Sequence, residues 1–147
     1  MHRSGKVAVF TAAVLSGCLG FASISRADAP VNFETQIKPI LKESCVKCHS
    51  VNDQHKKPAG GLRLDDKEAA LKGGRHKDDI VPGDSTKSLL YKLLLGPTTV
   101  DSKHVDAMPK QKKGEAFKPL PKEQIDLVKA WIDQGAKWSD TATTSSH

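Results

Sequence analysis

Cysteine and methionine are scarce in this chain of 147 residues, which contains three cysteines and two methionines. No apolar run is long enough to span a bilayer: the run at residues 7–15 is far short of the roughly 20 residues that a spanning helix needs. No segment alternates convincingly between apolar and polar residues as a half-buried strand does, and no internal repeat or long linker is found. These absences exclude a membrane-spanning bundle and a repeat protein, and they favour a helical domain.

The N-terminus has the pattern of an export signal. Arg3 and Lys6 precede the apolar run, and Ser25-Arg26-Ala27 supplies a small-residue cleavage site with no acidic residue before it. We therefore expect residues 1–27 to be a signal peptide and the protein to be exported to the periplasm. In the alternative, residues 15–18 resemble a lipobox, the signal ends before Cys18, and the acylated Cys18 anchors the protein to a membrane.

Cleavage after Ala27 would leave residues 28–147, which is enough for one domain. We expect this domain to occupy residues 28–138 and to be monomeric, followed by a disordered polar tail at residues 139–147. Removing the three basic residues of the signal lowers the formal net charge from +6 to +3. That charge gives no reason to expect a nucleic-acid partner.

The remaining two cysteines form a Cys-x-x-Cys-His run with the histidine that follows. In such a run the thiols of Cys45 and Cys48 can each add across a vinyl group of haem, and His49 can ligate the iron. A disulfide across this spacing would gain little entropy, a thioredoxin-like dithiol needs a βαβ context, and a structural zinc site needs further ligands. The run therefore predicts one covalently attached haem c.

The second axial position of the iron requires another ligand. Met108, followed by Pro109, is the only methionine beyond the signal segment and lies in a polar, lysine-rich stretch without apolar periodicity. We expect it to be the distal ligand, in a segment laid across the haem face. His104 is an alternative ligand, and an open distal position would instead allow a haem enzyme or a protein that binds peroxide or a gas.

Helical signals surround these residues. Asn32 can cap a first helix that continues to Cys45, with Pro39 kinking it or marking where its regular part begins. Two short helices are expected at residues 65–71 and 85–94, each ended by glycine, and a longer one begins at Pro121. Its predicted buried stripe consists of Ile125, Val128, Trp131 and Ile132.

Charge is unevenly distributed along the chain. Residues 103–122 contain six lysines against two acidic residues, whereas residues 62–87 contain six basic and six acidic residues. A lysine cluster beside the ligand-bearing segments would steer an acidic redox partner to the haem, although lysines also simply keep a small domain soluble. The acidic pair Asp65-Asp66 is interpreted as a helix cap, and Asp78-Asp79 as part of a solvated loop.

Several separated segments together resemble a planctomycete-type cytochrome c domain. They are Cys45–His49, Gly60–Asp65, Ile80–Gly83 with Ser88–Leu90, Met108-Pro109, and Leu120-Pro121 through Trp131–Ala136 and Trp138. The resemblance implies an all-α, compact cytochrome c fold of about four short helices around one haem. It also implies thioether bonds at Cys45 and Cys48, with His49 as proximal and Met108 as distal ligand.

The resemblance implies an electron carrier, and it adds no catalytic residue. We therefore expect single electrons to pass between redox protein partners, and we do not expect an enzyme. The sequence departs from the family pattern at Arg75-His76-Lys77 and in the charged loop at residues 110–118.

Overall fold

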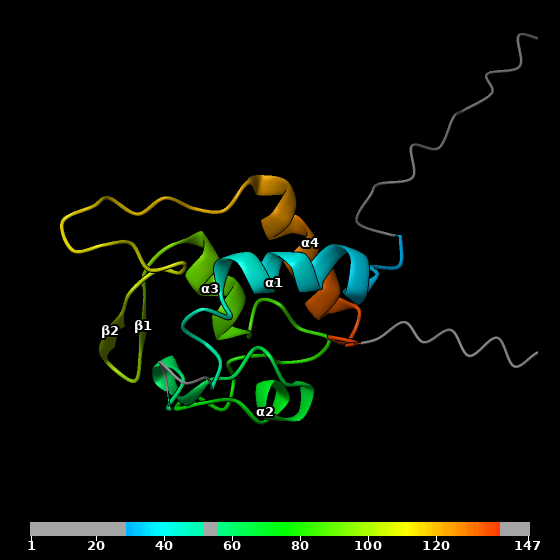
Figure 1. The fold of residues 1–147 in the computed structure, drawn as a ribbon, viewed down its shortest axis with the longest axis horizontal. Coiled ribbons are helices and arrows are strands. Elements are labelled where there is room, and N and C mark those ends of the chain that lie inside the picture. The colour runs from blue at the N-terminus through cyan, green and yellow to red at the C-terminus, as the bar shows by residue number, and fades with distance from the viewer. Residues whose placement is uncertain (1–28, 52–55, 139–147) are drawn as a thin grey trace, which may run out of the picture.

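The computed structural model describes residues 29–51 and 56–138. The predicted signal peptide with Cys18, and the predicted tail at residues 139–147, lie outside the described residues. No helix in the described ranges is long and apolar enough to cross a membrane. In chain order the elements are η2 (Phe33–Ile37), α1 (Lys38–Ser44), η3 (Ala59–Gly61), α2 (Lys67–Lys72), α3 (Leu89–Leu95), β1 (Thr98–Val100), β2 (Lys103–Val105) and α4 (Lys122–Asp133) (Figure 1).

The first helix begins as the sequence predicts. The Asn32 side chain accepts a hydrogen bond from the Thr35 N–H at 2.9 Å, and residues Phe33–Ile37 form a π-helical turn. Pro39 lies in the first turn of α1, where its missing N–H costs no helical hydrogen bond. It therefore marks the start of the regular α-helix, as predicted.

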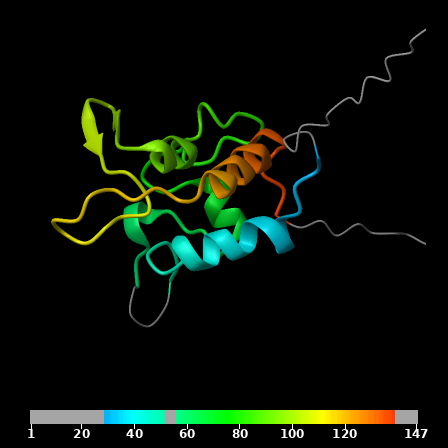
Figure 2. The same ribbon diagram turned by 90° about the horizontal axis from the view of Figure 1, so that it is seen from above.

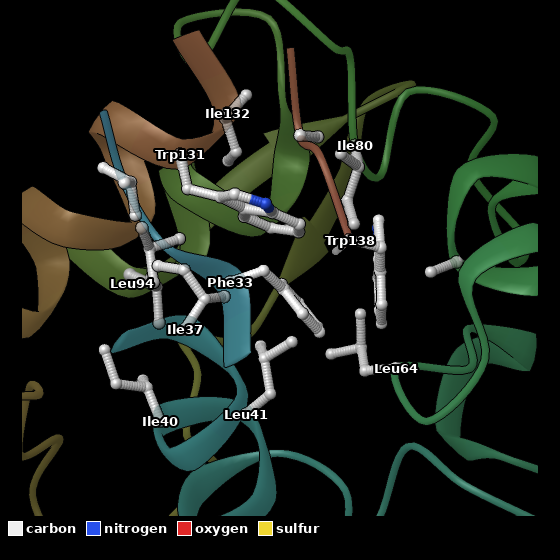
Figure 3. Packing of buried hydrophobic residues seen from close by; sticks show 14 of the residues in the cluster. Phe33, Ile37, Ile40, Leu41, Leu64, Ile80, Leu94, Trp131, Ile132 and Trp138 are labelled. Carbon is white, nitrogen blue, oxygen red and sulfur yellow. The ribbon is translucent and has the colours of Figure 1, made fainter. Parts of the chain in front are cut away.

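The last helix forms the centre of the fold. All four residues of its predicted stripe are buried, and α4 packs through them against η2 and α3. The Trp131 ring lies 5.9 Å from that of Phe33 and 5.7 Å from that of Trp138, and Figure 3 shows Phe33 among the two indoles and Leu64. The chain beyond the helix turns at Gly135, which has a φ of 97° that glycine adopts without strain.

The expectation of an all-α fold is wrong. Strands β1 and β2 form an antiparallel hairpin in which Thr98 pairs with Val105 and Val100 with Lys103. Asp101 and Ser102 form its two-residue turn, both with positive φ. Such turns usually contain Asn-Gly or Asp-Gly, so the Asp-Ser turn gave a weak signal, and strands of three residues are too short for a recognisable alternation.

Helix α3 also begins later than predicted, at residue 89 instead of 85. Residues 84–88 form a separate turn in which the Ser88 N–H donates to the carbonyls of Asp84 and Ser85. The Ser88 hydroxyl lies within 2.9 Å of the Asp84 carbonyl and is fully buried. A polar side chain that bonds the local backbone favours such a turn over a helix interior.

The hairpin and the C-terminal end of α1 lie at the same end of the molecule. Figures 1 and 2, which are perpendicular views, both place β1, β2 and the segment after them at the end where α1 leads into Cys45. The fold thus brings together two regions that are about 60 residues apart in sequence, and both carry predicted haem ligands.

Candidate functional site

The Cys-x-x-Cys-His run forms one helical turn that continues α1. The Cys45 N–H donates to the Leu41 carbonyl at 2.9 Å, and the N–H groups of Cys48 and His49 donate to the Cys45 carbonyl at 3.1 and 2.9 Å. This turn holds both thiols and the imidazole on one short piece of backbone. Both thiols are free, and no disulfide joins them.

The two thiols have different surroundings. Cys48 is exposed, whereas Cys45 is half-buried and packs against the hydrophobic core. Burial, with a smaller contribution from Cys48, raises the pKa of the Cys45 thiol to about 11. A group at this position is therefore favoured in an uncharged form, and a thioether is uncharged.

The His49 ring is held by a backbone carbonyl. Its Nδ1 lies 3.2 Å from the Leu62 carbonyl oxygen, and because a carbonyl only accepts, Nδ1 carries the proton. The other ring nitrogen, Nε2, is then left with a lone pair for a metal. Metal-bound histidines usually have such a second hydrogen bond, which orients the ring and increases its basicity.

The segment around Leu62 is itself tied to the Cys-x-x-Cys-His turn. The Ala59 N–H donates to the Cys48 carbonyl at 2.9 Å, and the Leu64 N–H donates to the His49 carbonyl at 2.7 Å. The two hydrogen bonds flank the Leu62 carbonyl on either side. The two bonds therefore contribute to its position relative to His49.

The segment around Gly74 and Arg75 supports the segment that carries the Leu62 carbonyl. The Arg75 N–H donates to the Gly60 carbonyl at 2.8 Å, and a Cβ on Gly74 would lie 2.5 Å from both the Gly60 carbonyl oxygen and the Leu62 nitrogen. Only glycine allows this close approach at position 74, whereas Gly60 and Gly61 have the positive φ values, 61° and 76°, that glycine adopts without strain. The glycines are visible in the sequence, but the sequence does not show that the two segments meet.

The interpretation of Asp78-Asp79 as solvated is wrong for Asp79. Its side chain is buried, with 6 % of the residue exposed, and it accepts a hydrogen bond from the Gly74 N–H at 2.7 Å. Burial raises the pKa of Asp79, and the Gly74 hydrogen bond opposes that shift. Asp78 is exposed, as predicted.

The predicted distal ligand lies on a separate segment at the same end of the molecule. Met108 is half-buried, its N–H donates to the Leu93 carbonyl of α3 at 2.8 Å, and its peptide bond to Pro109 is cis. His104, the alternative ligand, is exposed on β2, with 68 % of its side chain accessible, and lies 3.3 Å from Asp106. These surroundings favour Met108 over His104.

The donors present fit a haem. Two free thiols on one turn match two vinyl groups, and His49 offers one nitrogen whose ring is already oriented. Within the described ranges, no group of three or more His, Cys, Asp or Glu side chains lies in an arrangement that could hold a metal ion.

Comparison with known proteins agrees with this chemistry. Residues 45–111 match the family described as Planctomycete cytochrome C, a span that runs from the first thiol past Met108. No curated protein and no solved structure matches the chain. Cytochrome c domains bind haem c covalently and take part in electron transfer. The match over residues 45–111 supports the resemblance to a planctomycete-type cytochrome c domain.

Proposed function

We propose that the chain is an exported mono-haem c-type cytochrome that carries single electrons between redox partners. In this proposal Cys45 and Cys48 hold the haem by thioether bonds, and His49 and Met108 ligate the iron. The observation that carries it is the His49 ring, whose Nδ1–H is committed to the Leu62 carbonyl at 3.2 Å. That hydrogen bond leaves Nε2 as the ring nitrogen available to the iron, on the same turn as two free thiols.

The residues of the site have distinct tasks. When bound, haem c supplies an iron that accepts or releases one electron. The two cysteines would prevent loss of the haem, and His49 and Met108 would both ligate the iron and keep small molecules from it. A thioether ligand favours the reduced form relative to a second imidazole, so this ligand pair favours a potential toward the oxidising side of the haem range.

The lysines near Met108 support a partner with an acidic docking surface. Of the six lysines in residues 103–122, Lys110 pairs with Asp106 at 3.0 Å and Lys122 pairs with Asp126. In the described part of the chain the other four have no carboxylate within salt-bridge distance; they are Lys103, Lys112, Lys113 and Lys118. We propose that these lysines attract an acidic redox protein to the haem end, so that association slows as ionic strength rises.

The ligand assignment is tested by the visible spectrum of the oxidised protein. The parent should show the weak far-red band of sulfur-to-iron charge transfer, Met108→Ala should lose it, and the control His104→Ala should keep it. The reduction potential of Met108→Ala should also fall, because the thioether is lost. A parent spectrum that is high-spin and shifts at once with cyanide would contradict the carrier and support an enzyme with an open distal position.

A further inference from the structure

Helix α3 is hydrogen-bonded to both segments of the candidate site. The Leu93 carbonyl accepts the Met108 N–H at 2.8 Å, on the distal side. At the start of the helix, the N–H of Leu90 donates to the Asp79 carbonyl and that of Leu89 to the Asp78 carbonyl, both at 2.9 Å. Residues 78 and 79 are therefore fixed to the same helix that holds Met108.

The Asp79 side chain extends this connection to Gly74. The carboxylate is buried and accepts the Gly74 N–H at 2.7 Å. A buried carboxylate is unfavourable unless it is hydrogen-bonded, and a hydrogen bond to an ionised acceptor is stronger than one between neutral groups. This bond therefore fixes the position of the Gly74 backbone relative to α3.

Gly74 in turn lies against the backbone that holds His49. The ideal position of a Cβ on Gly74 is 2.5 Å from the Leu62 nitrogen and from the Gly60 oxygen, so the two backbones touch. The Arg75 N–H bond to Gly60 at 2.8 Å joins the same two segments. The contacts form a continuous path from Asp79 through Gly74 to Leu62, whose carbonyl accepts the His49 ring N–H.

We propose that Asp79 is a positioning residue for His49: its carboxylate holds Gly74 against Leu62, and the Leu62 carbonyl thereby keeps the imidazole in one orientation. The proposal rests on the proposed function, in which His49 ligates the haem iron. Loss of the Asp79 acceptor would leave the Gly74 N–H unpaired, loosen the contact with Leu62 and weaken the ring hydrogen bond.

The test uses the holoprotein and three variants: Asp79→Ala, Asp79→Asn and the control Asp78→Ala. Proton NMR of the oxidised protein measures the haem methyl shifts, which report ligand orientation, and the exchange rate of the His49 ring N–H. Asp79→Ala should change the methyl shifts and speed the exchange by about tenfold or more, because a buried donor loses its partner. Asp79→Asn keeps an acceptor oxygen without the charge and should stay close to the parent. Asp78→Ala removes an equal charge from an exposed neighbour and should match the parent.

Two outcomes would overturn the proposal. One is a folded Asp79→Ala with the methyl shifts and exchange rate of the parent. The other is an Asp79→Asn that behaves like Asp79→Ala, which would assign the effect to charge. If Asp79→Ala does not fold, Gly74→Ala is compared with Gly83→Ala, in which the new Cβ meets nothing within 4 Å and the only cost is backbone strain at a φ of 87°. Faster ring exchange in Gly74→Ala than in Gly83→Ala supports the proposal, and equal exchange overturns it. A parent without paramagnetically shifted His49 ring signals would instead refute iron ligation by His49.

Discussion

The contribution of one indole hydrogen bond to stability can be measured by making the same substitution at the two buried tryptophans, which are neighbours in the core. The indole N–H of Trp131 donates to the Lys137 carbonyl at 2.7 Å, whereas the buried indole N–H of Trp138 has no hydrogen-bond partner among the described residues. The rings lie 5.7 Å apart in the same cluster. Replacing each by phenylalanine therefore removes a similar volume from the same core but only one hydrogen bond.

The expected loss of unfolding free energy differs between the two variants. Phenylalanine is smaller than tryptophan by about 40 Å³, and at about 24 cal/mol per Å³ of cavity this costs each variant about 1 kcal/mol. Trp131→Phe also loses the hydrogen bond to the carbonyl of the exposed Lys137, whose net contribution is about 0.5–1.5 kcal/mol, whereas Trp138→Phe removes a donor that was already unpaired. Trp131→Phe should therefore lose about 1.5–2.5 kcal/mol and Trp138→Phe about 1 kcal/mol or less.

Urea denaturation of the haem-bound variants, followed by circular dichroism, measures both losses. The difference between the variants, at least about 0.5 kcal/mol, corresponds to a thermal midpoint about 2 °C or more lower for Trp131→Phe. Equal losses would show that the Trp131 hydrogen bond contributes nothing beyond packing. A larger loss in Trp138→Phe would refute the assignment of the unpaired donor.

Three further predictions concern a helix cap, acid stability and charge. Asp66→Ala removes the side chain that accepts the third N–H of α2 at 2.8 Å, and should cost about 1 kcal/mol in urea denaturation. The Arg63 guanidinium holds the pKa of Asp65 in the folded protein below its usual value. The ion pair therefore stabilises the fold at pH values above the pKa of Asp65 in the unfolded chain, and its contribution is lost as the pH falls through the pKa of Asp65 in the folded protein. The stability gap between the parent and Arg63→Gln at neutral pH should close in acid, and a gap that widens in acid would contradict the sign. In stopped-flow measurements at low salt, the double variant Lys112→Glu, Lys113→Glu should be oxidised several-fold more slowly than the parent by anionic ferricyanide. Its oxidation by a cationic cobalt complex should not be slowed, and equal slowing with both oxidants would contradict electrostatic steering.

Local signals explain which parts of the fold the sequence predicts. The apolar stripe of α4, the Asn32 cap and the first-turn Pro39 each depend on residues within one or two turns, and the structure confirms all three. The hairpin was missed because Asp101 and Ser102 adopt positive φ without the glycine that usually signals it.

The site shows the same division between local and long-range information. The Cys-x-x-Cys-His run predicts the haem chemistry directly, since its spacing lies within one helical turn. The support of His49 could not be predicted, because it depends on the approach of Gly74 to Leu62 and on the burial of Asp79. Both are tertiary effects, and nothing in residues 78–79 distinguishes the buried carboxylate from its exposed neighbour.

Mass spectrometry of the denatured protein from its native host tests whether one haem is bonded covalently to Cys45 and Cys48. The mass should exceed that of the polypeptide by one haem, and after proteolysis the increment should remain on the peptide that contains Cys45–His49. A mass equal to that of the polypeptide alone, or a pigment that is lost into acidified acetone, would contradict covalent attachment.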